Sequence, residues 1–329
     1  MAARKKIDSE ILRRLGSPQD SFISGEVLAR GLGISRTAVW KHVSGLKARG
    51  FPIESLPSKG YRLGGPLETF NKLSISAGMP TELIGQEIHF FDTLPSTNER
   101  AALLAIEGEP EGSVVICDTQ TNGRGRLGRS WSSPPGVNLY ASIILRPRAA
   151  VHELQGITLL GAVAVAETVA LFSKKTPSVK WPNDVLLDSK KVAGILMEMH
   201  TEGEMARFVV AGIGVNLNMD PRLLPNPLNR EATSIRNSGG RAVPRADFTR
   251  ALFLSLELWY KTFLKKGLSA IIEAWRGYFL AEGKPVEVRS HQKTVKGICL
   301  GVDNFGALLI RDSSGVTKKV LSGDLVRGT

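Results

Sequence analysis

The stretch Gly123-Arg124-Gly125-Arg126-Leu127-Gly128-Arg129-Ser130-Trp131-Ser132-Ser133 interleaves three glycines and three arginines within seven positions, and an indole follows. Glycine has no Cβ and permits positive φ, so a ligand can approach the backbone amides, which form an anion-binding concavity. Arginine adds planar, permanently charged forks that suit phosphate and carboxylate oxygens. The stretch therefore predicts an anion-binding loop. A solvated basic turn and an RGG-like nucleic-acid contact are the alternatives that it leaves open.

The composition around this loop is that of a multidomain globular chain. The 329 residues are 42% hydrophobic and 22% charged, which fits two or three domains with buried cores. The net charge of +12 favours polyanionic partners or substrates. The only two cysteines, Cys117 and Cys299, lie far apart, which fits a reducing compartment and argues against a disulfide scaffold or a cysteine-based metal site.

The chain shows no signal for a membrane or a secretory route. No apolar core segment follows the basic start, and the longest apolar run, about 157–172, contains Glu167 and is short for a bilayer. We therefore expect a cytoplasmic protein that does not enter a membrane.

The amino-terminal residues carry most of the positive charge and a helical pattern. Residues 1–66 contain twelve Lys or Arg and five acids, a net charge of +7. Three helices are expected, the second capped by Ser24 and the third by Ser35, with a tight glycine turn between them. On the third helix Val39, Val43 and Leu46 should face inward, which leaves polar and basic residues outside. Two short strands, 51–55 and 61–63, are expected to form a wing with a basic tip.

These features together predict a winged helix-turn-helix DNA-binding domain over residues 1–65. A three-helix packing module with a solvated basic face is the structural alternative. The residues that we expect at the DNA are Ser24, Ser35, Arg36, Thr37, Trp40, Lys41, His42 and Lys59. Gly64-Gly65-Pro66 breaks the pattern and is predicted to be the linker.

Residues 66–282 alternate short apolar runs with helical stretches, which predicts an α+β domain with a mixed sheet. The expected strands are 88–91, 114–118, 138–146, 178–181, 185–187, 192–198 and 208–217, and the expected helices are 97–107 and 151–172. Asp188-Ser189-Lys190 reads as a hairpin turn, so part of the sheet should be antiparallel.

Further polar clusters lie in this domain. Ser96-Thr97-Asn98 precedes a helix, either as a simple N-cap or as a group of ligand hydrogen-bonders at a positive helix end. Lys180-Trp181-Pro182-Asn183-Asp184, with Lys191 across the hairpin, suits neutralisation of phosphate charge with or without Mg²⁺. Gly212-Ile213-Gly214-Val215-Asn216 offers a glycine-thinned strand that a flat ligand can approach.

Helical core faces at 252–263 and 271–279 are followed, in residues 283–329, by runs of alternating residues separated by turns. Strands are expected at 286–288, 297–302, 307–310 and 319–321. They predict a small β-barrel, whose role is packing against the central domain, contact with a carrier protein or contact with a nucleotide.

Taken in order, these motifs resemble the biotin–protein ligases, and the winged helix-turn-helix resembles that of the bifunctional members that also repress biotin-operon transcription. The matching elements are Ser96-Thr97-Asn98, Gln120, GRGRxGRxW at 123–131, KWPND at 180–184, Lys191 with Gly194-Ile195-Leu196, and GIGVN at 212–216. The resemblance implies a class II synthetase-like catalytic domain and an SH3-like carboxyl-terminal barrel.

The resemblance also implies a two-step reaction. Biotin and ATP would give biotinyl-5′-adenylate and pyrophosphate, and the adenylate would acylate a lysine of the biotin carboxyl carrier protein of acetyl-CoA carboxylase. The implied biotin-binding residues are Ser96, Thr97, Asn98, Gln120, Arg124, Gly125, Arg126 and Lys191. The implied ATP and adenylate contacts are Arg124, Arg126, Arg129, Trp131 and Asn216. The implied catalytic residues are Arg126, Lys191 and Asp184, with Mg²⁺ accompanying ATP and no metal site built by the protein itself.

Physical chemistry is consistent with these roles. A carboxylate that attacks a triphosphate brings two anions together, so guanidinium and ammonium groups should supply much of the catalysis. A mixed anhydride hydrolyses readily, so the loop at 123–132 should close over it. The family also implies an adenylate-promoted homodimer on operator DNA of biotin genes. A transcription factor that only senses a ligand and a related lipoate ligase are the competing hypotheses.

Overall fold

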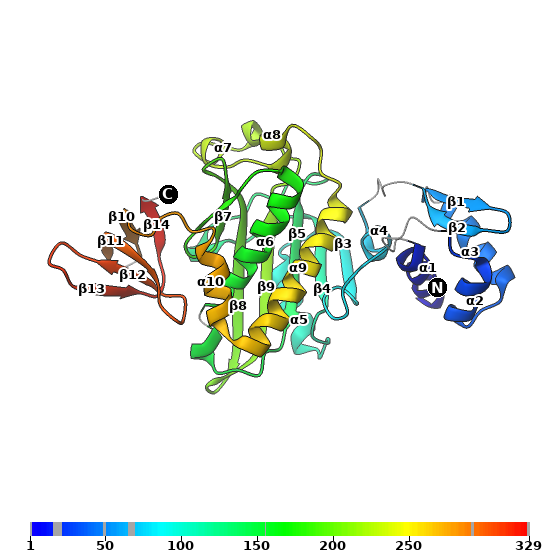
Figure 1. Cartoon of the computed structure of the whole chain (residues 1–329), viewed down its shortest axis with the longest axis horizontal. Coiled ribbons are helices and arrows are strands. Elements are labelled where there is room, and N and C mark those ends of the chain that lie inside the picture. The colour runs from blue at the N-terminus through cyan, green and yellow to red at the C-terminus, as the bar shows by residue number, and fades with distance from the viewer. Residues whose placement is uncertain are drawn as a thin grey trace.

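The computed structural model describes residues 2–15, 22–48, 51–64, 70–154, 156–290 and 293–327. Figure 1 shows three bodies in chain order: a small helical domain, a central sheet covered by helices, and a small β domain. Gly65 and Pro66 of the predicted linker, and with them the predicted boundary between the first two domains, lie outside the described residues.

The amino-terminal domain is a three-helix unit with a two-stranded wing. Its elements are α1 Ala2–Leu15, α2 Gly25–Leu32, α3 Arg36–Ala48, β1 Ile53–Leu56 and β2 Gly60–Leu63. The Ser24 hydroxyl accepts from the Val27 amide and the Ser35 hydroxyl from the Ala38 amide, so both predicted caps are confirmed. The inward face predicted for α3 is buried in the domain core.

The central domain is built on a seven-stranded mixed sheet, as predicted. Its strands are β3 Ile88–Leu94, β4 Val114–Gln120, β5 Leu139–Leu145, β6 Ser178–Lys180, β7 Asp184–Leu187, β8 Lys190–Glu202 and β9 Met205–Val215, in the spatial order β3-β4-β5-β9-β8-β7-β6. Only β3 and β4 pair in parallel; the other neighbours are antiparallel. Asp188 and Ser189 both have positive φ in the β7–β8 turn, which confirms the predicted hairpin.

Helices cover both faces of this sheet. α6 Ile157–Ser173, α9 Arg245–Lys266 and α10 Leu268–Arg276 lie over one face, as Figure 1 shows, and α5 Thr97–Ile106 packs on the other. The expected start of α6 at residue 151 was wrong. A 3₁₀ turn, η2 Val151–Leu154, comes first, and a Cβ on Gly156 would lie 2.7 Å from the Phe305 carbonyl oxygen, so a glycine is required where the helix begins.

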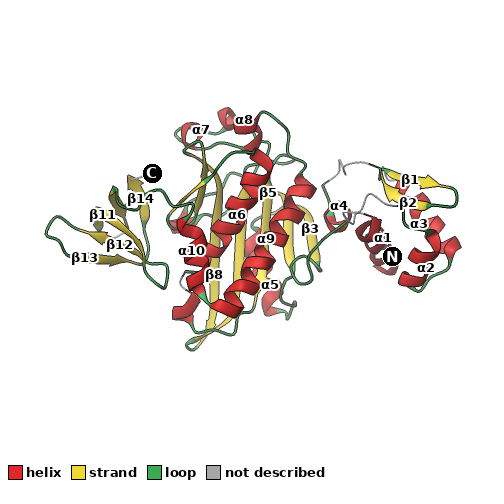
Figure 2. Cartoon of the chain, viewed as in Figure 1, coloured by secondary structure: helices red, strands yellow, loops and turns green. Residues whose placement is uncertain are grey.

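The apolar stretch Val151–Ser173 has the length and composition of a membrane span, but 72% of its most apolar 18-residue window is buried inside the protein. Figure 2 shows α6 among the helices over the sheet. Its apolar character on all sides is therefore that of a core helix between the sheet and α9.

Shorter elements complete the domain and join it to its neighbours. They are α4 Lys72–Ser76, η1 Arg126–Gly128, η3 Pro221–Leu223, α7 Leu228–Glu231 and α8 Ile235–Gly239. α4 divides its side chains between two cores. Leu73 and Ala77 pack with the amino-terminal domain, whereas Ile75 belongs to the central core. This short helix therefore docks the first domain on the second.

The carboxyl-terminal domain is a five-stranded antiparallel sheet. Its strands are β10 Pro285–Arg289, β11 Thr294–Val302, β12 Leu308–Arg311, β13 Thr317–Val320 and β14 Asp324–Arg327, in the order β13-β12-β11-β10-β14. The last strand was not predicted; of Asp324, Leu325 and Val326 only Leu325 is buried, so the strand shows no clear alternation of apolar and polar residues. The domain contacts the central one through Trp181, whose Nε1 donates to the Gly306 carbonyl at 3.0 Å.

Leu160 and Leu171 of α6 provide a matched test of this packing. Leu160 is 1% exposed and Leu171 is 55% exposed. Leu160→Ala should lower the free energy of unfolding of the central domain by about 2–5 kcal/mol, since it opens a cavity in the core. Leu171→Ala should change that free energy by less than about 0.5 kcal/mol. Urea denaturation followed by circular dichroism measures both; equal effects would contradict the assigned orientation of α6.

Candidate active site

The candidate site lies on the face of the sheet that α5 covers, at the point where large side chains give way to glycine. Phe208 and Val210 of β9 pack under α5, and Gly212 and Gly214 continue the same row. On β8, Gly194 lies beside Gly214. The result is a cavity of about 750 Å³ above bare backbone.

One end of the cavity is a network of mostly uncharged polar groups at the start of α5, with the Glu198 carboxylate behind it. The Gln120 side-chain carbonyl accepts from the Thr97 amide at 2.9 Å, and the Ser142 hydroxyl donates to Asn98 Oδ1 at 2.6 Å. Asn98 Nδ2 donates to Glu198 at 2.6 Å. A Cβ on Gly212 would lie 2.0 Å from Asn98 Oδ1, so the glycine is required for Asn98 to reach this position.

Ser96 is the N-cap of α5, and its hydroxyl accepts from the Glu99 amide at 3.5 Å. Ser96, Thr97 and Asn98 are all buried and line the cavity. The structure thus combines both sequence interpretations, since a capping group also presents hydroxyl and amide groups to the cavity. This end can exchange several hydrogen bonds with a neutral polar ligand.

The Trp131 indole lies over the glycine row. A Cβ on Gly214 would come within 2.6 Å of the ring, and one on Gly194 within 2.9 Å. The Lys191 ammonium lies 5.3 Å from the ring centroid, a cation–π distance. Trp131 Nε1 is buried and has no hydrogen-bond partner among the described residues. The indole is therefore a wall of the cavity with a donor to offer.

The Gly/Arg loop that carries Trp131 folds back on itself. The Gly125 amide donates to the Arg129 carbonyl at 2.7 Å, and the Trp131 amide to the Gly123 carbonyl at 2.8 Å. Leu127, between them, has a φ of 56°, a left-handed conformation that costs a non-glycine residue on the order of 1–2 kcal/mol. The loop thus holds a strained turn by a few hydrogen bonds, which is a conformation that can open.

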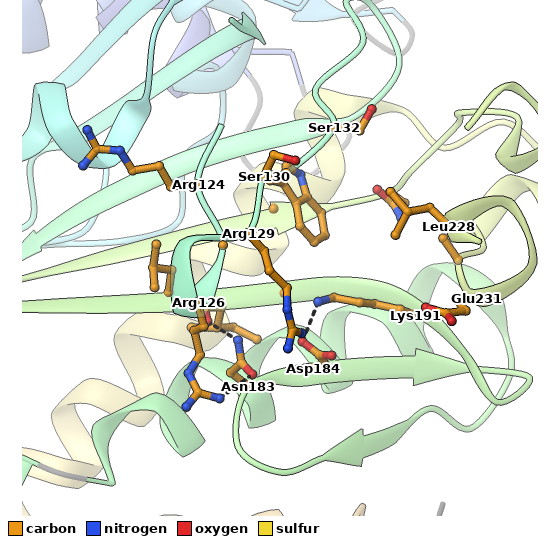
Figure 3. A pocket seen from close by; sticks show the side chains of 18 of the residues that line it. Arg124, Arg126, Arg129, Ser130, Ser132, Asn183, Asp184, Lys191, Leu228 and Glu231 are labelled. Atoms are coloured by element: carbon orange, nitrogen blue, oxygen red, sulfur yellow. Dashed lines mark hydrogen bonds and ion pairs between the residues drawn. The ribbon is translucent and has the colours of Figure 1, made fainter. Parts of the chain in front are cut away.

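The three loop arginines reach different partners. Arg124 pairs with Glu99 at 3.2 Å, whereas Arg126 donates to Asn183 Oδ1 and to the Gly323 carbonyl, both at 3.3 Å. Figure 3 shows Arg126 and Arg129 directed toward the segment that carries Asn183 and Asp184, and Arg124 directed away from it. Burial lowers the pKa of the Arg126 guanidinium, which marks a cation that has lost part of its hydration.

Arg129 forms an ion pair with Asp324 of β14, so the loop also touches the carboxyl-terminal domain. The sequence analysis missed Asp324 because β14 was not predicted.

Lys191 and Asp184 form the charged centre of the cavity. Their Nζ and Oδ1 atoms are 2.7 Å apart, and Figure 3 shows Lys191 directed toward Asp184. They lie on neighbouring strands of the predicted hairpin. Lys180 also lines the cavity, half-buried, and its ammonium has no partner among the described residues. The site can therefore hold an anion against several cations, with one carboxylate beside them.

The far end of the cavity is closed by the segment after β9. Asn216 is buried, and its Nδ2 donates to the Thr233 carbonyl at 3.0 Å, which fixes where the segment returns to the sheet. Leu224 and Leu228 from this segment line the cavity. They were missed from the sequence, although apolar residues beside closely spaced prolines were a signal.

Two polar residues of the network, Ser142 and Ser133, were also missed. Ser142 lies opposite Gly212 in the sheet, and Ser133 accepts from Gln120 Nε2 at 2.9 Å. A hydroxyl within the apolar run of β5 was the available signal for the first. Nothing in the sequence marks Ser133 among its neighbouring serines.

The predicted DNA-contact residues fall into three groups. Arg36, Thr37, Trp40 and Lys41 are exposed on α3, and Lys59 is exposed at the wing tip. Ser24 and Ser35 serve as helix caps. His42 differs from the prediction: its Nδ1 lies 2.6 Å from Asp8 of α1, and its side chain is only 13% exposed. This geometry favours a structural role for His42 between two helices.

The glycine row can be tested by a single added methyl group. Gly214→Ala should displace the indole, because overpacking of this kind costs about 1–3 kcal/mol. We expect trypsin to cleave at the loop arginines at least about fivefold faster in this variant. Gly239→Ala is the matched control, because its Cβ would meet only ordinary contacts. Unchanged cleavage in Gly214→Ala would show that the indole does not depend on the bare strand.

Comparison with known proteins assigns the chain to a family. The Biotin/lipoate A/B protein ligase family model matches residues 90–216, an HTH domain model matches 9–62, and the Biotin protein ligase C terminal domain model matches 283–328. The chain is 36% identical to the bifunctional ligase/repressor BirA of Bacillus subtilis, over 99% of this chain and all of that protein. It is 33% identical to that of Escherichia coli, over 92% of each chain.

A solved structure supports the same family assignment. The biotin protein ligase of Aquifex aeolicus in complex with biotin and ATP is 28% identical and superposes with a TM-score of 0.64, over 74% of this chain and all of that one. The chain therefore belongs to the biotin–protein ligase family, and in its full length it matches the bifunctional ligase/repressors of that family.

Proposed function

We propose that the chain is an ATP-dependent biotin–protein ligase that also represses biotin-synthesis genes. It joins biotin and ATP into biotinyl-5′-adenylate with release of pyrophosphate, and then transfers biotin to a lysine of a carrier protein. The observation that carries this function is the meeting, in one cavity, of a neutral hydrogen-bonding end, a Gly/Arg loop and the Lys191–Asp184 pair.

The neutral end of the cavity suits the ureido ring of biotin. A ureido group offers one carbonyl and two N–H groups, and Ser96, Thr97, Asn98 and Gln120 present hydroxyl and amide partners for them. Biotin would then extend its carboxylate toward the charged centre.

The cationic part of the cavity suits the reacting carboxylate and the phosphates. Attack of the biotin carboxylate on the α-phosphorus forms the mixed anhydride and expels pyrophosphate. Arg124, Gly125, Arg126 and Lys191 are assigned to the carboxylate and α-phosphate, and Arg129 to the phosphate side. Trp131 and Asn216 are assigned to the adenine, with Leu224 and Leu228 as the apolar wall beside it.

Asp184 is assigned to the transfer step and to the metal that accompanies ATP. In the transfer, the carrier lysine attacks the acyl carbon, AMP leaves, and a carboxylate orients the incoming amine. No group of three His, Cys, Asp or Glu that could hold a metal occurs in the described ranges. Mg²⁺ needs no such group here, since it is commonly bound by one carboxylate together with substrate phosphates.

The ligase reaction is tested with biotin, ATP and an apo carrier domain, read by streptavidin blot. Lys191→Ala should slow biotin transfer by about 10²–10³-fold, because it removes a cation from the developing negative charge. Lys190→Ala, the exposed neighbouring lysine outside the cavity, should transfer at the wild-type rate. Absence of transfer by the wild type would reject the enzyme, and transfer of lipoate in place of biotin would reassign it.

Retention of the adenylate is assigned to the closed loop and to Arg126 in particular. Arg126→Gly should weaken adenylate retention by about ten- to a hundredfold, the range expected when charged hydrogen bonds are lost. Released adenylate should then label lysines of a bystander protein such as serum albumin. A variant that retained adenylate as tightly as the wild type would remove Arg126 from this role.

The repressor function is assigned to the amino-terminal domain, with exposed cations on α3 and at the wing tip facing operator DNA. When carrier is scarce, adenylate accumulates and promotes a homodimer that spans two half-sites. A chain that only senses a ligand would not need the ATP side of the cavity. We expect the enzyme to work in the cytoplasm, with a class II synthetase-like second domain and a closed SH3-like barrel as its third domain.

Coupling between ligand and DNA is tested by gel shift at the promoter of the biotin-synthesis genes. Biotin plus ATP should tighten binding by at least about fivefold, the lower end of typical allosteric coupling. The Lys191→Ala variant, which forms adenylate slowly, should show little tightening. Equal affinity of the wild type with and without biotin and ATP would contradict coupled repression.

A further inference from the structure

Trp40 is an exposed indole on α3. Trp181 and Trp275 are buried in cores, whereas the Trp40 side chain is 58% exposed and makes no aromatic or cation–π contact among the described residues. A tryptophan offers one of the largest apolar surfaces of any side chain, and exposed aromatic residues are enriched where proteins bind partners. The packing of the domain does not account for an indole at this position.

The surroundings of Trp40 show which kind of partner it meets. Arg36 and Thr37 lie one helical turn before it on the same side of α3, and Lys41 follows it; all three are exposed. Between Glu26 and Glu54 the chain carries five Lys or Arg and no acid. An exposed apolar ring among exposed cations of the same helix is complementary to DNA, which offers phosphates and apolar base surfaces together.

The position of Trp40 on α3 indicates which part of the DNA it contacts. The first turns of a recognition helix are the part that reaches base edges in the major groove, and Trp40 lies in the second turn after the Ser35 cap. The wing is held beside the start of α2 by the Ile23–Tyr61 backbone pair, so Lys59 at its tip can reach the DNA backbone next to the groove. In the major groove, thymine alone presents an apolar group, its 5-methyl.

We propose that Trp40 reads thymine through its 5-methyl group and is a specificity-determining residue of the operator. The inference rests on the proposed repressor function. Arg36, Thr37 and Lys41 supply hydrogen bonds and charge, and the indole covers a methyl group that uracil lacks. The indole therefore contributes sequence selectivity through apolar contact and not through an ion pair.

The test uses the full-length chain with biotin and ATP. A duplex is first selected by the wild-type protein from a random library, and each dT of that duplex is then replaced singly by dU, which removes only the methyl group. We expect one position in each half-site at which dU weakens wild-type binding about three- to fourfold, the effect of one buried methyl group. Trp40→Ala should bind the dT and dU duplexes with equal affinity.

Lys41→Ala is the matched control on the same helix. It should keep the dU effect and reduce the slope of log affinity against log salt by about one, whereas Trp40→Ala should leave that slope unchanged. DNA binding with the wild-type salt slope verifies that the amino-terminal domain of Trp40→Ala is folded. A duplex selected without any dU effect, or a dU effect retained in Trp40→Ala, overturns the inference and leaves the repressor function standing. A loss of self-association in Trp40→Ala with the dU effect unchanged also overturns the inference. That result would assign the indole to a contact between two copies of the chain. Failure to select any duplex overturns both.

Discussion

The candidate site depends on a row of the central sheet in which glycines leave the backbone without side chains. Gly212 gives Asn98 room to reach the network under α5, and Gly214 and Gly194 give the Trp131 indole its seat. Because Trp131 terminates the Gly/Arg loop, the same bare backbone that makes the cavity also fixes where the loop lies when it is folded down. The packing of the sheet and the position of the Gly/Arg loop therefore depend on the same glycines.

Charge in the site is arranged so that a substrate must compete for it. Arg124, Arg129 and Lys191 each have a carboxylate partner, and Arg126 is bound to an amide and a backbone carbonyl. An anionic intermediate would take over several of these cations together, and the displaced carboxylates would be free for other roles. Since Asp324 belongs to the third domain, the folded loop is also held by that domain.

Much of the fold and part of the candidate site could be predicted from the sequence. Strand and helix patterns located the central sheet, the β7–β8 hairpin and the capped helices of the first domain, because burial on one side imposes a regular spacing. Residues that act through register or through distant contacts could not be found: Ser142 matters because it lies opposite Gly212, and Asp324 because β14 brings it to Arg129. The contact of His42 with Asp8 could not be predicted, because Asp8 comes from a helix whose packing no local pattern reveals.

The central claim is that the Gly/Arg loop closes over the acyl-adenylate. Hydrogen–deuterium exchange of peptides that cover residues 123–131, with and without biotin plus ATP, measures this most directly, and the wing turn at 56–60 serves as an internal reference. Biotin plus ATP should slow exchange in the loop by about tenfold or more, equivalent to a stabilisation of about 1.4 kcal/mol against local opening, and should leave exchange in the wing unchanged. Loop exchange at the same rate in both states would contradict it.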